Sequence, residues 1–79
     1  MDNKQKYKKS FIDGLSIDEN SLEGNLEYNG VVEWDSIGHM SLIAELEDQF
    51  DIMMEMDDII DFSGYEKGKE IIKKYNIDI

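Results

Sequence analysis

Apolar residues recur along much of this chain at the three- and four-residue spacing that lets a helix bury one face. The first such stretch runs from about Lys4 to Leu15, and Gly14 and Ser16 indicate where it weakens and ends. Its apolar face consists of Tyr7, Phe11, Ile12 and Leu15. This stretch predicts an amphipathic helix near the start of the chain.

The clearest helical pattern begins at Asp35 or Ser36, either of which is a favourable N-cap residue, and ends near Phe50. Because successive residues of a helix are rotated by about 100°, the apolar residues of this stretch fall on two sides of the helix. The side expected to face the core consists of His39, Leu42, Ile43, Leu46 and Phe50. The nearly opposite side consists of Ile37, Met40 and Ala44, edged by Glu47 and Asp48. An exposed apolar strip rimmed by acids indicates a docking surface, unless the preceding loop or the next helix covers it.

The end of the chain predicts two more helices. A short one covers roughly Met56 to Asp61, and a longer one follows Ser63 and ends near Asn76. Ser63 and Glu66 have the spacing of a capping box, in which each side chain bonds to the other residue's backbone amide. The methionines of this region, Ile59, Ile60 and Phe62 are expected to lie in the core.

Residues 16 to 34 form a long connection rich in Asn, Gly and Glu, with a short turn of helix expected near Asp18 to Leu22. The apolar residues expected to anchor it are Ile17, Leu22, Leu26, Tyr28, Val31, Val32 and Trp34. The prediction is therefore an all-α fold. It is a small four-helix bundle of three main helices and one short helix, with a long first loop, in a single domain spanning residues 1–79.

Charge changes this picture of an ordinary bundle. The chain has 19 acidic residues, 8 lysines and a net charge of −11, and no lysine or arginine lies between residues 10 and 66. The negative electrostatic field of these acids repels nucleic acid and anionic membranes and attracts basic protein surfaces. Disorder is disfavoured because 41% of the residues are apolar and follow helical patterns. We expect a cytoplasmic monomer with no nucleic-acid or membrane partner.

Candidate chemistry within the chain is sparse. The absence of cysteine excludes disulfides and thiolate metal sites. No window has the acidic spacing of a calcium-binding EF-hand loop, so Asp57, Asp58 and Asp61 are interpreted as a solvated face and no metal is expected. His39 begins the same helix as Ser36 without a clear orienting acid, and it is interpreted as a residue at the core edge or at a pocket rim. The sequence does not predict an enzyme.

The segment Asp35-Ser36-Ile37, followed by Leu42, Leu46 and Phe50, resembles the acyl carrier protein family. That family places Asp-Ser followed by Leu, Ile or Val at the start of the second helix of a four-helix bundle. The resemblance extends over essentially the whole chain, including the long first loop, the short third helix and the lysine-containing last helix.

The resemblance implies that Ser36 is the serine to which a phosphopantetheinyl transferase attaches 4′-phosphopantetheine. The arm would carry acyl groups of fatty acid, polyketide or related biosynthesis as thioesters. The residues implied to meet the transferase and acyl-transferring enzymes with basic surfaces are Asp35, Ile37, Met40, Ala44, Glu47 and Asp48. The candidate acyl-pocket residues are Leu46, Ile59, Phe62 and Ile72. A serine at a helix N-terminus would also place the phosphate at the positive end of the helix dipole.

Two alternatives stay open. Gly38 and Ser41 stand where many fatty-acid carriers have acidic residues, and His39 replaces a more usual small or polar residue. These departures change the expected set of partners. The first alternative is therefore a carrier of aminoacyl or peptidyl groups, such as D-alanyl groups, which shares the same attachment chemistry. The alternative of a different class is an acidic adaptor without a cofactor, whose negative surface is itself the function.

Overall fold

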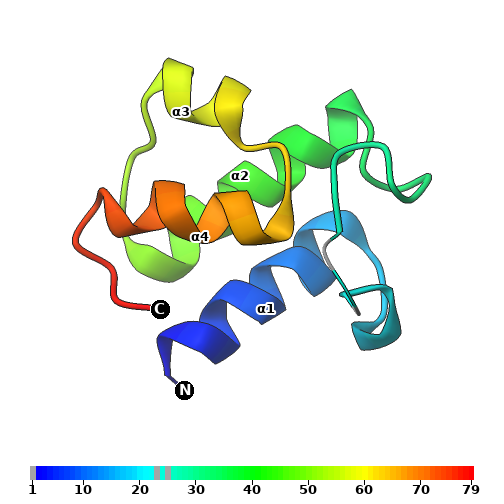
Figure 1. Ribbon diagram of the computed structural model, residues 1–79, viewed down its shortest axis with the longest axis horizontal. Helices are drawn as coiled ribbons and strands as arrows, with labels where there is room; N and C mark the ends of the chain where they lie inside the picture. The colour runs from blue at the N-terminus through cyan, green and yellow to red at the C-terminus, as the bar shows by residue number, and fades with distance from the viewer. Residues whose placement is uncertain (1, 23, 25) are drawn as a thin grey trace.

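The protein is an all-helical bundle, as the apolar spacing predicts. The computed structural model describes residues 2–22, 24 and 26–79. Its elements are α1 (Asn3–Leu15), a 3-10 turn η1 (Glu19–Leu22), α2 (Ser36–Phe50), α3 (Met56–Asp61) and α4 (Tyr65–Lys73), arranged as in Figure 1. Within the described residues there are four α-helices and no β-strand, only an isolated bridge between Glu27 and Gly64.

Helix α1 is defined by its two ends and by its contact with α2. The helix begins at Asn3, one residue before the predicted start, and Asp2 caps it through a capping box with Gln5. Ser16 ends it in the left-handed conformation. A Cβ on Gly14 would lie 2.7 Å from the Leu42 Cα atom. The glycine therefore lets the backbones of α1 and α2 approach closely.

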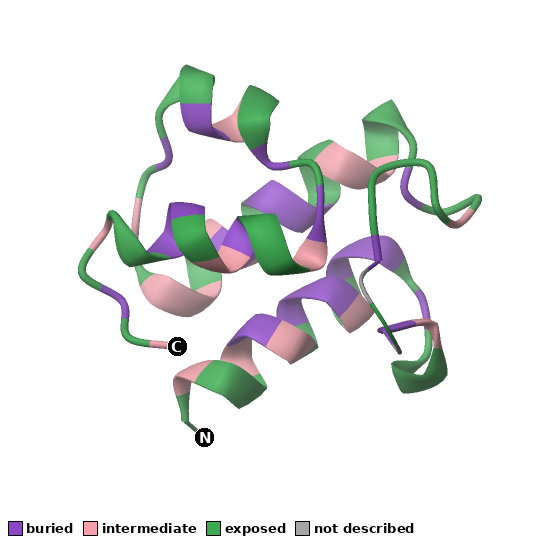
Figure 2. Cartoon of the chain, in the orientation of Figure 1, coloured by how far each residue is buried: buried purple, intermediate pink, exposed green. Residues whose placement is uncertain are grey.

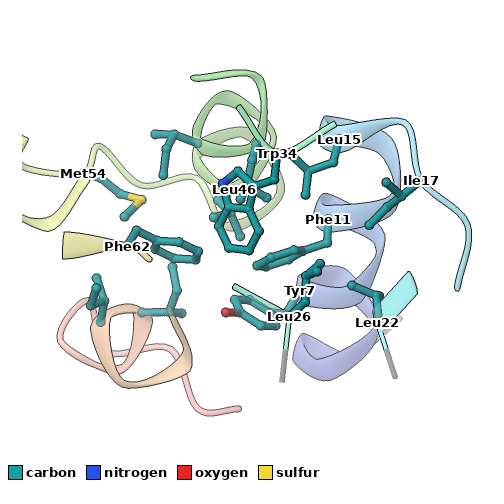
Figure 3. Packing of buried hydrophobic residues seen from close by; sticks show 14 of the residues in the cluster. Tyr7, Phe11, Leu15, Ile17, Leu22, Leu26, Trp34, Leu46, Met54 and Phe62 are labelled. Atoms are coloured by element: carbon teal, nitrogen blue, oxygen red, sulfur yellow. The ribbon is translucent and has the colours of Figure 1, made fainter. Parts of the chain in front are cut away.

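Buried aromatic rings from α1, the long loop and the segment between α3 and α4 meet in the core, as Figure 3 shows for Tyr7, Phe11, Trp34 and Phe62. Figure 2 marks the buried stretches of the backbone. The rings of Phe11 and Trp34 meet edge to face with centroids 5.4 Å apart. The Tyr7 hydroxyl donates a 2.6 Å hydrogen bond to the Tyr65 carbonyl oxygen, which joins α1 to α4. The largest fully buried side chains are Trp34, Tyr7, Phe11, Phe62, Leu42, Leu46, Ile72 and Ser10.

The long loop is fixed to the start of α4 by backbone hydrogen bonds. Tyr28 N donates to Ser63 O over 2.9 Å, and Tyr65 N donates to Leu26 O over 2.7 Å. The expected capping box at Ser63 is therefore wrong: α4 begins after Gly64 without a side-chain cap, because the loop carbonyl accepts a first-turn amide. Of the expected loop anchors, Ile17, Leu22, Leu26 and Trp34 are buried, Val31 is half-buried, and Tyr28 and Val32 are exposed.

Helix α3 buries a charged residue that is paired with the end of the chain. Asp58 is its only buried residue; Lys74 Nζ donates to Asp58 Oδ1 over 2.5 Å and Tyr75 Oη donates to Oδ2 over 2.6 Å. These hydrogen bonds keep the pKa of the Asp58 carboxyl below its usual value. The expectation that the apolar residues of this region lie in the core is wrong for Met53, Met56 and Ile60, which are exposed. Met53 lies in the connection before α3, and Met56 and Ile60 are exposed because only one side of so short a helix contacts the bundle.

Candidate functional site

Ser36 is the first residue of α2 and its side chain is exposed, as expected. The preceding residue, Asp35, caps the helix: its Oδ1 atom accepts a 2.8 Å hydrogen bond from Gly38 N. The Asp35 carboxylate thus fixes the first turn and leaves the Ser36 hydroxyl at the surface. A macromolecule can therefore reach this hydroxyl at the N-terminus of a helix of 15 residues.

Glycine at position 38 is required by the loop that leads into α2. A Cβ at this position would lie 1.9 Å from the Glu33 carbonyl oxygen, which is a backbone atom and cannot rotate away. Position 38 is therefore glycine, and not acidic as in many fatty-acid carriers, because a side chain would clash with the loop. The glycine lets the loop pass close to the helix start and helps to place Ser36.

A hollow of about 410 Å³ opens beside Ser36, between the start of α2 and helix α3. This volume lies within the usual range of small-molecule sites. Ser36, His39 and Met40 line it from α2, Met56, Ile59 and Ile60 from α3, and Tyr28, Phe62 and Ser63 from the flanking segments. We call this hollow the Ser36 groove; most of its lining is apolar and none of it is acidic.

The candidate pocket residues divide into two sets. Ile59 and Phe62 line the Ser36 groove, as the resemblance implies for an acyl pocket. Leu46 and Ile72 do not line it, because both are fully buried in the core. The sequence identified the apolar character of all four residues. Only the packing of α3 against α2 determines which of them face the groove.

His39 lies half-buried at the rim of the groove, where it joins three segments. Trp34 Nε1 donates a 3.0 Å hydrogen bond to His39 Nδ1, and His39 Nε2 lies 2.8 Å from the Ile59 carbonyl oxygen. Since indole N–H only donates and a carbonyl only accepts, the ring carries its proton on Nε2. The side chain therefore ties α3 to the loop and to α2, a role that residue spacing alone did not indicate.

An exposed apolar surface continues from the groove. On α2, Ile37 is 80% exposed, Met40 is 58% exposed and Ala44 is exposed, which confirms that this strip is not covered. Met56 and Ile60 of α3 are also exposed and line the groove together with Met40. We call Ile37, Met40, Met56 and Ile60 the α2–α3 patch. The patch lies entirely within the lysine-free segment of the chain.

The two acids at the edge of the strip have different surroundings. Asp48 is exposed, whereas Glu47 is half-buried and its Oε2 atom accepts a 2.9 Å hydrogen bond from Met54 N. Glu47 thus fixes the turn between α2 and α3. Substitution of Glu47 would disturb this turn, so Asp48 is the better residue for testing the contribution of acidic charge.

Among the described residues, no group of three or more His, Cys, Asp or Glu side chains is arranged to hold a metal ion. In the same part of the chain, no helix has both the length and the apolar character needed to span a membrane. Comparison with protein-family models, with curated proteins and with solved structures gives no match.

Proposed function

We propose that this chain is an acyl carrier protein that holds 4′-phosphopantetheine on Ser36 and delivers acyl groups to partner enzymes in the cytoplasm. The observation that carries the proposal is an exposed serine at the start of α2 that opens onto an apolar groove. The sequence resemblance around Asp35-Ser36-Ile37 supplies the identity of the cofactor.

The surroundings of Ser36 suit the attachment of a phosphate. In the proposed transfer, Ser36 Oγ would lose its proton and form a bond to the pantetheine-side phosphorus of coenzyme A. The pyrophosphate linkage would break, adenosine 3′,5′-bisphosphate would leave, and the new anionic group would stand at the N-terminus of α2. The helix dipole and the first-turn amides favour negative charge there. The thiol at the far end of the arm would bind the acyl group, which is chemistry that a chain without cysteine does not supply itself.

The composition of the groove favours an acyl cargo over an aminoacyl cargo. An aminoacyl group carries an ammonium, which needs a carboxylate or several hydrogen-bond acceptors when it leaves water. The groove offers Met40, Met56, Ile59, Ile60 and Phe62 and no acidic side chain. An apolar acyl chain that entered it would gain about 25 cal/mol for each Å² of apolar surface removed from water.

Replacement of Ser36 by alanine tests the proposal directly. Incubation with coenzyme A and a broad-specificity phosphopantetheinyl transferase should add one phosphopantetheine to the wild-type chain, and intact-mass spectrometry should show no addition to Ser36→Ala. Ser63→Ala is the matched control, because Ser63 is exposed and lines the same groove. It should be modified like the wild type. A wild-type chain that gains no mass would instead support the cofactor-free adaptor.

Reversal of charge at Asp48 tests recognition by a basic partner. In Asp48→Lys the initial rate of loading should fall about threefold or more at low ionic strength, because the acidic surface steers the transferase. The difference should largely vanish in roughly 1 M salt, where charges are screened over about 3 Å. Asp18→Lys changes the net charge equally at an exposed loop position and should load normally. Equal slowing in both variants would argue against a defined acidic docking site.

A further inference from the structure

The lysines of this chain are confined to two helices and their immediate ends. Lys4, Lys6, Lys8 and Lys9 belong to α1, Lys67, Lys69 and Lys73 belong to α4, and Lys74 caps α4. The segment between these two groups, residues 10 to 66, contains acidic residues but no lysine or arginine. An anion repelled by most of the surface is therefore attracted to the region where α1 and α4 present their lysines together.

A second hollow, of about 430 Å³, lies in that region between α1, η1 and α4. Lys4 and Lys8 line it from α1 and Lys69 lines it from α4, whereas Glu19 is the one acidic residue in its lining. Tyr65 lines the same hollow with a half-buried ring, whereas Tyr7, which also borders it, has no exposed surface. We call it the lysine hollow. It shares no residue with the Ser36 groove, so its role does not depend on the proposed carrier function.

The three ammonium groups remain accessible to an external anion. Lys8 pairs with Glu19, and Lys69 Nζ lies 3.1 Å from Glu66 Oε2, but the side chains in both pairs are partly exposed to solvent. Such pairs are weak and exchange readily with other anions. Lys4 forms no ion pair with any residue that the structure describes.

The aromatic part of the hollow stays uncharged. Burial raises the pKa of both Tyr7 and Tyr65 above the usual phenol range, so neither adds negative charge near neutral pH. The Tyr65 ring is half-buried, and the Lys69 ammonium lies 5.1 Å from its centroid. The same ring packs against Tyr7 and Phe11, so a flat apolar group contacts it when an attached acid group draws the Lys69 ammonium away from it.

We propose that the lysine hollow binds a small organic anion in which a carboxylate is attached to a planar apolar body. The carboxylate contacts Lys4, Lys8 and Lys69, and the planar body lies against Tyr65. Because the ammonium groups are solvated, the affinity for a small ligand is in the millimolar range, roughly 1–10 mM.

Titration of the full chain with benzoate, followed by amide chemical shifts in nuclear magnetic resonance spectra, tests this assignment. Benzoate should shift the amide signals of α1, η1 and the start of α4 in a saturable way. Acetate, which lacks the ring, and benzyl alcohol, which lacks the charge, should each bind at least threefold more weakly. Saturation by acetate at the same concentration as benzoate would overturn the role given to the ring.

Two triple variants distinguish binding in the lysine hollow from a general effect of net charge. Lys4→Gln, Lys8→Gln and Lys69→Gln together should abolish saturable binding of benzoate. Substitution of Lys6, Lys9 and Lys67 by Gln changes the net charge equally on the same helices but touches no residue of the hollow, and it should change the affinity less than twofold. Circular dichroism checks that both variants are folded. Absence of saturable shifts in the wild type, or equal losses in both variants, would overturn the proposal.

Discussion

Replacement of Trp34 by alanine is expected to lower the free energy of unfolding by about 3–5 kcal/mol, the usual cost of removing a large buried aromatic side chain. Trp34 has no exposed surface, packs edge to face on Phe11, and donates from Nε1 to His39. The variant would lose this packing and leave His39 Nδ1 without its partner. Since native proteins are stable by only about 5–15 kcal/mol, a loss of this size removes a large part of the free energy of unfolding.

Urea denaturation followed by circular dichroism measures this loss, because Trp34 is the only tryptophan and its fluorescence disappears in the variant. Val32→Ala is the control, since Val32 lies in the same loop but is 91% exposed. It should change the stability by less than about 0.5 kcal/mol. Trp34→Phe keeps much of the packing without the N–H donor and should be intermediate. Equal stability of Trp34→Ala and Val32→Ala would contradict the central position given to this ring.

Gly68→Ala is expected to destabilise the protein by about 1–3 kcal/mol, although alanine is the better helix former. Helix propensity alone predicts a gain of up to about 1 kcal/mol from this change. A Cβ at position 68 would however lie 2.3 Å from both Phe62 Cζ and Tyr7 Oη. Both rings are fully buried and the Tyr7 hydroxyl is hydrogen-bonded to Tyr65 O, so neither can move without breaking other contacts.

The sign of the change in stability decides between the two effects. Lys67→Ala, at the exposed neighbouring position of α4, reports helix propensity without the steric clash. We expect Lys67→Ala to be near neutral and Gly68→Ala to be clearly less stable in the same urea experiment. A stabilised Gly68→Ala would show that the core near Phe62 is loose enough to accept a methyl group.

The sequence predicted the helices well because their apolar residues repeat with the helical period over many residues. The two sides of α2 illustrate this: Leu42 and Leu46 are fully buried, whereas Ile37 is exposed, as the spacing indicated. The exposed position of Ser36 followed from the same reasoning, since helix starts lie at the surface unless another segment covers them.

The errors concern residues whose surroundings depend on distant segments. Helix α3 has six residues, too few for the spacing to show which side is buried, and the expectation that Met56 and Ile60 lie in the core therefore fails. Ser63 has the local signature of a cap, but a carbonyl from the long loop accepts the amide of Tyr65 instead. The bridging role of His39 was equally hidden, because its partner Ile59 lies on another helix.

The two walls of the Ser36 groove differ in what fixes them. The wall formed by α2 belongs to a helix anchored in the core. Helix α3 buries only Asp58, packs Ile59 partly against the core and is joined to the rest by hydrogen bonds from His39, Lys74 and Tyr75. A small outward movement of α3 therefore breaks polar contacts that water can replace, whereas the buried ring of Phe62, which ends α3, limits a larger movement. We expect the width of the groove to vary with this movement while the packing of α1, α2 and α4 is kept.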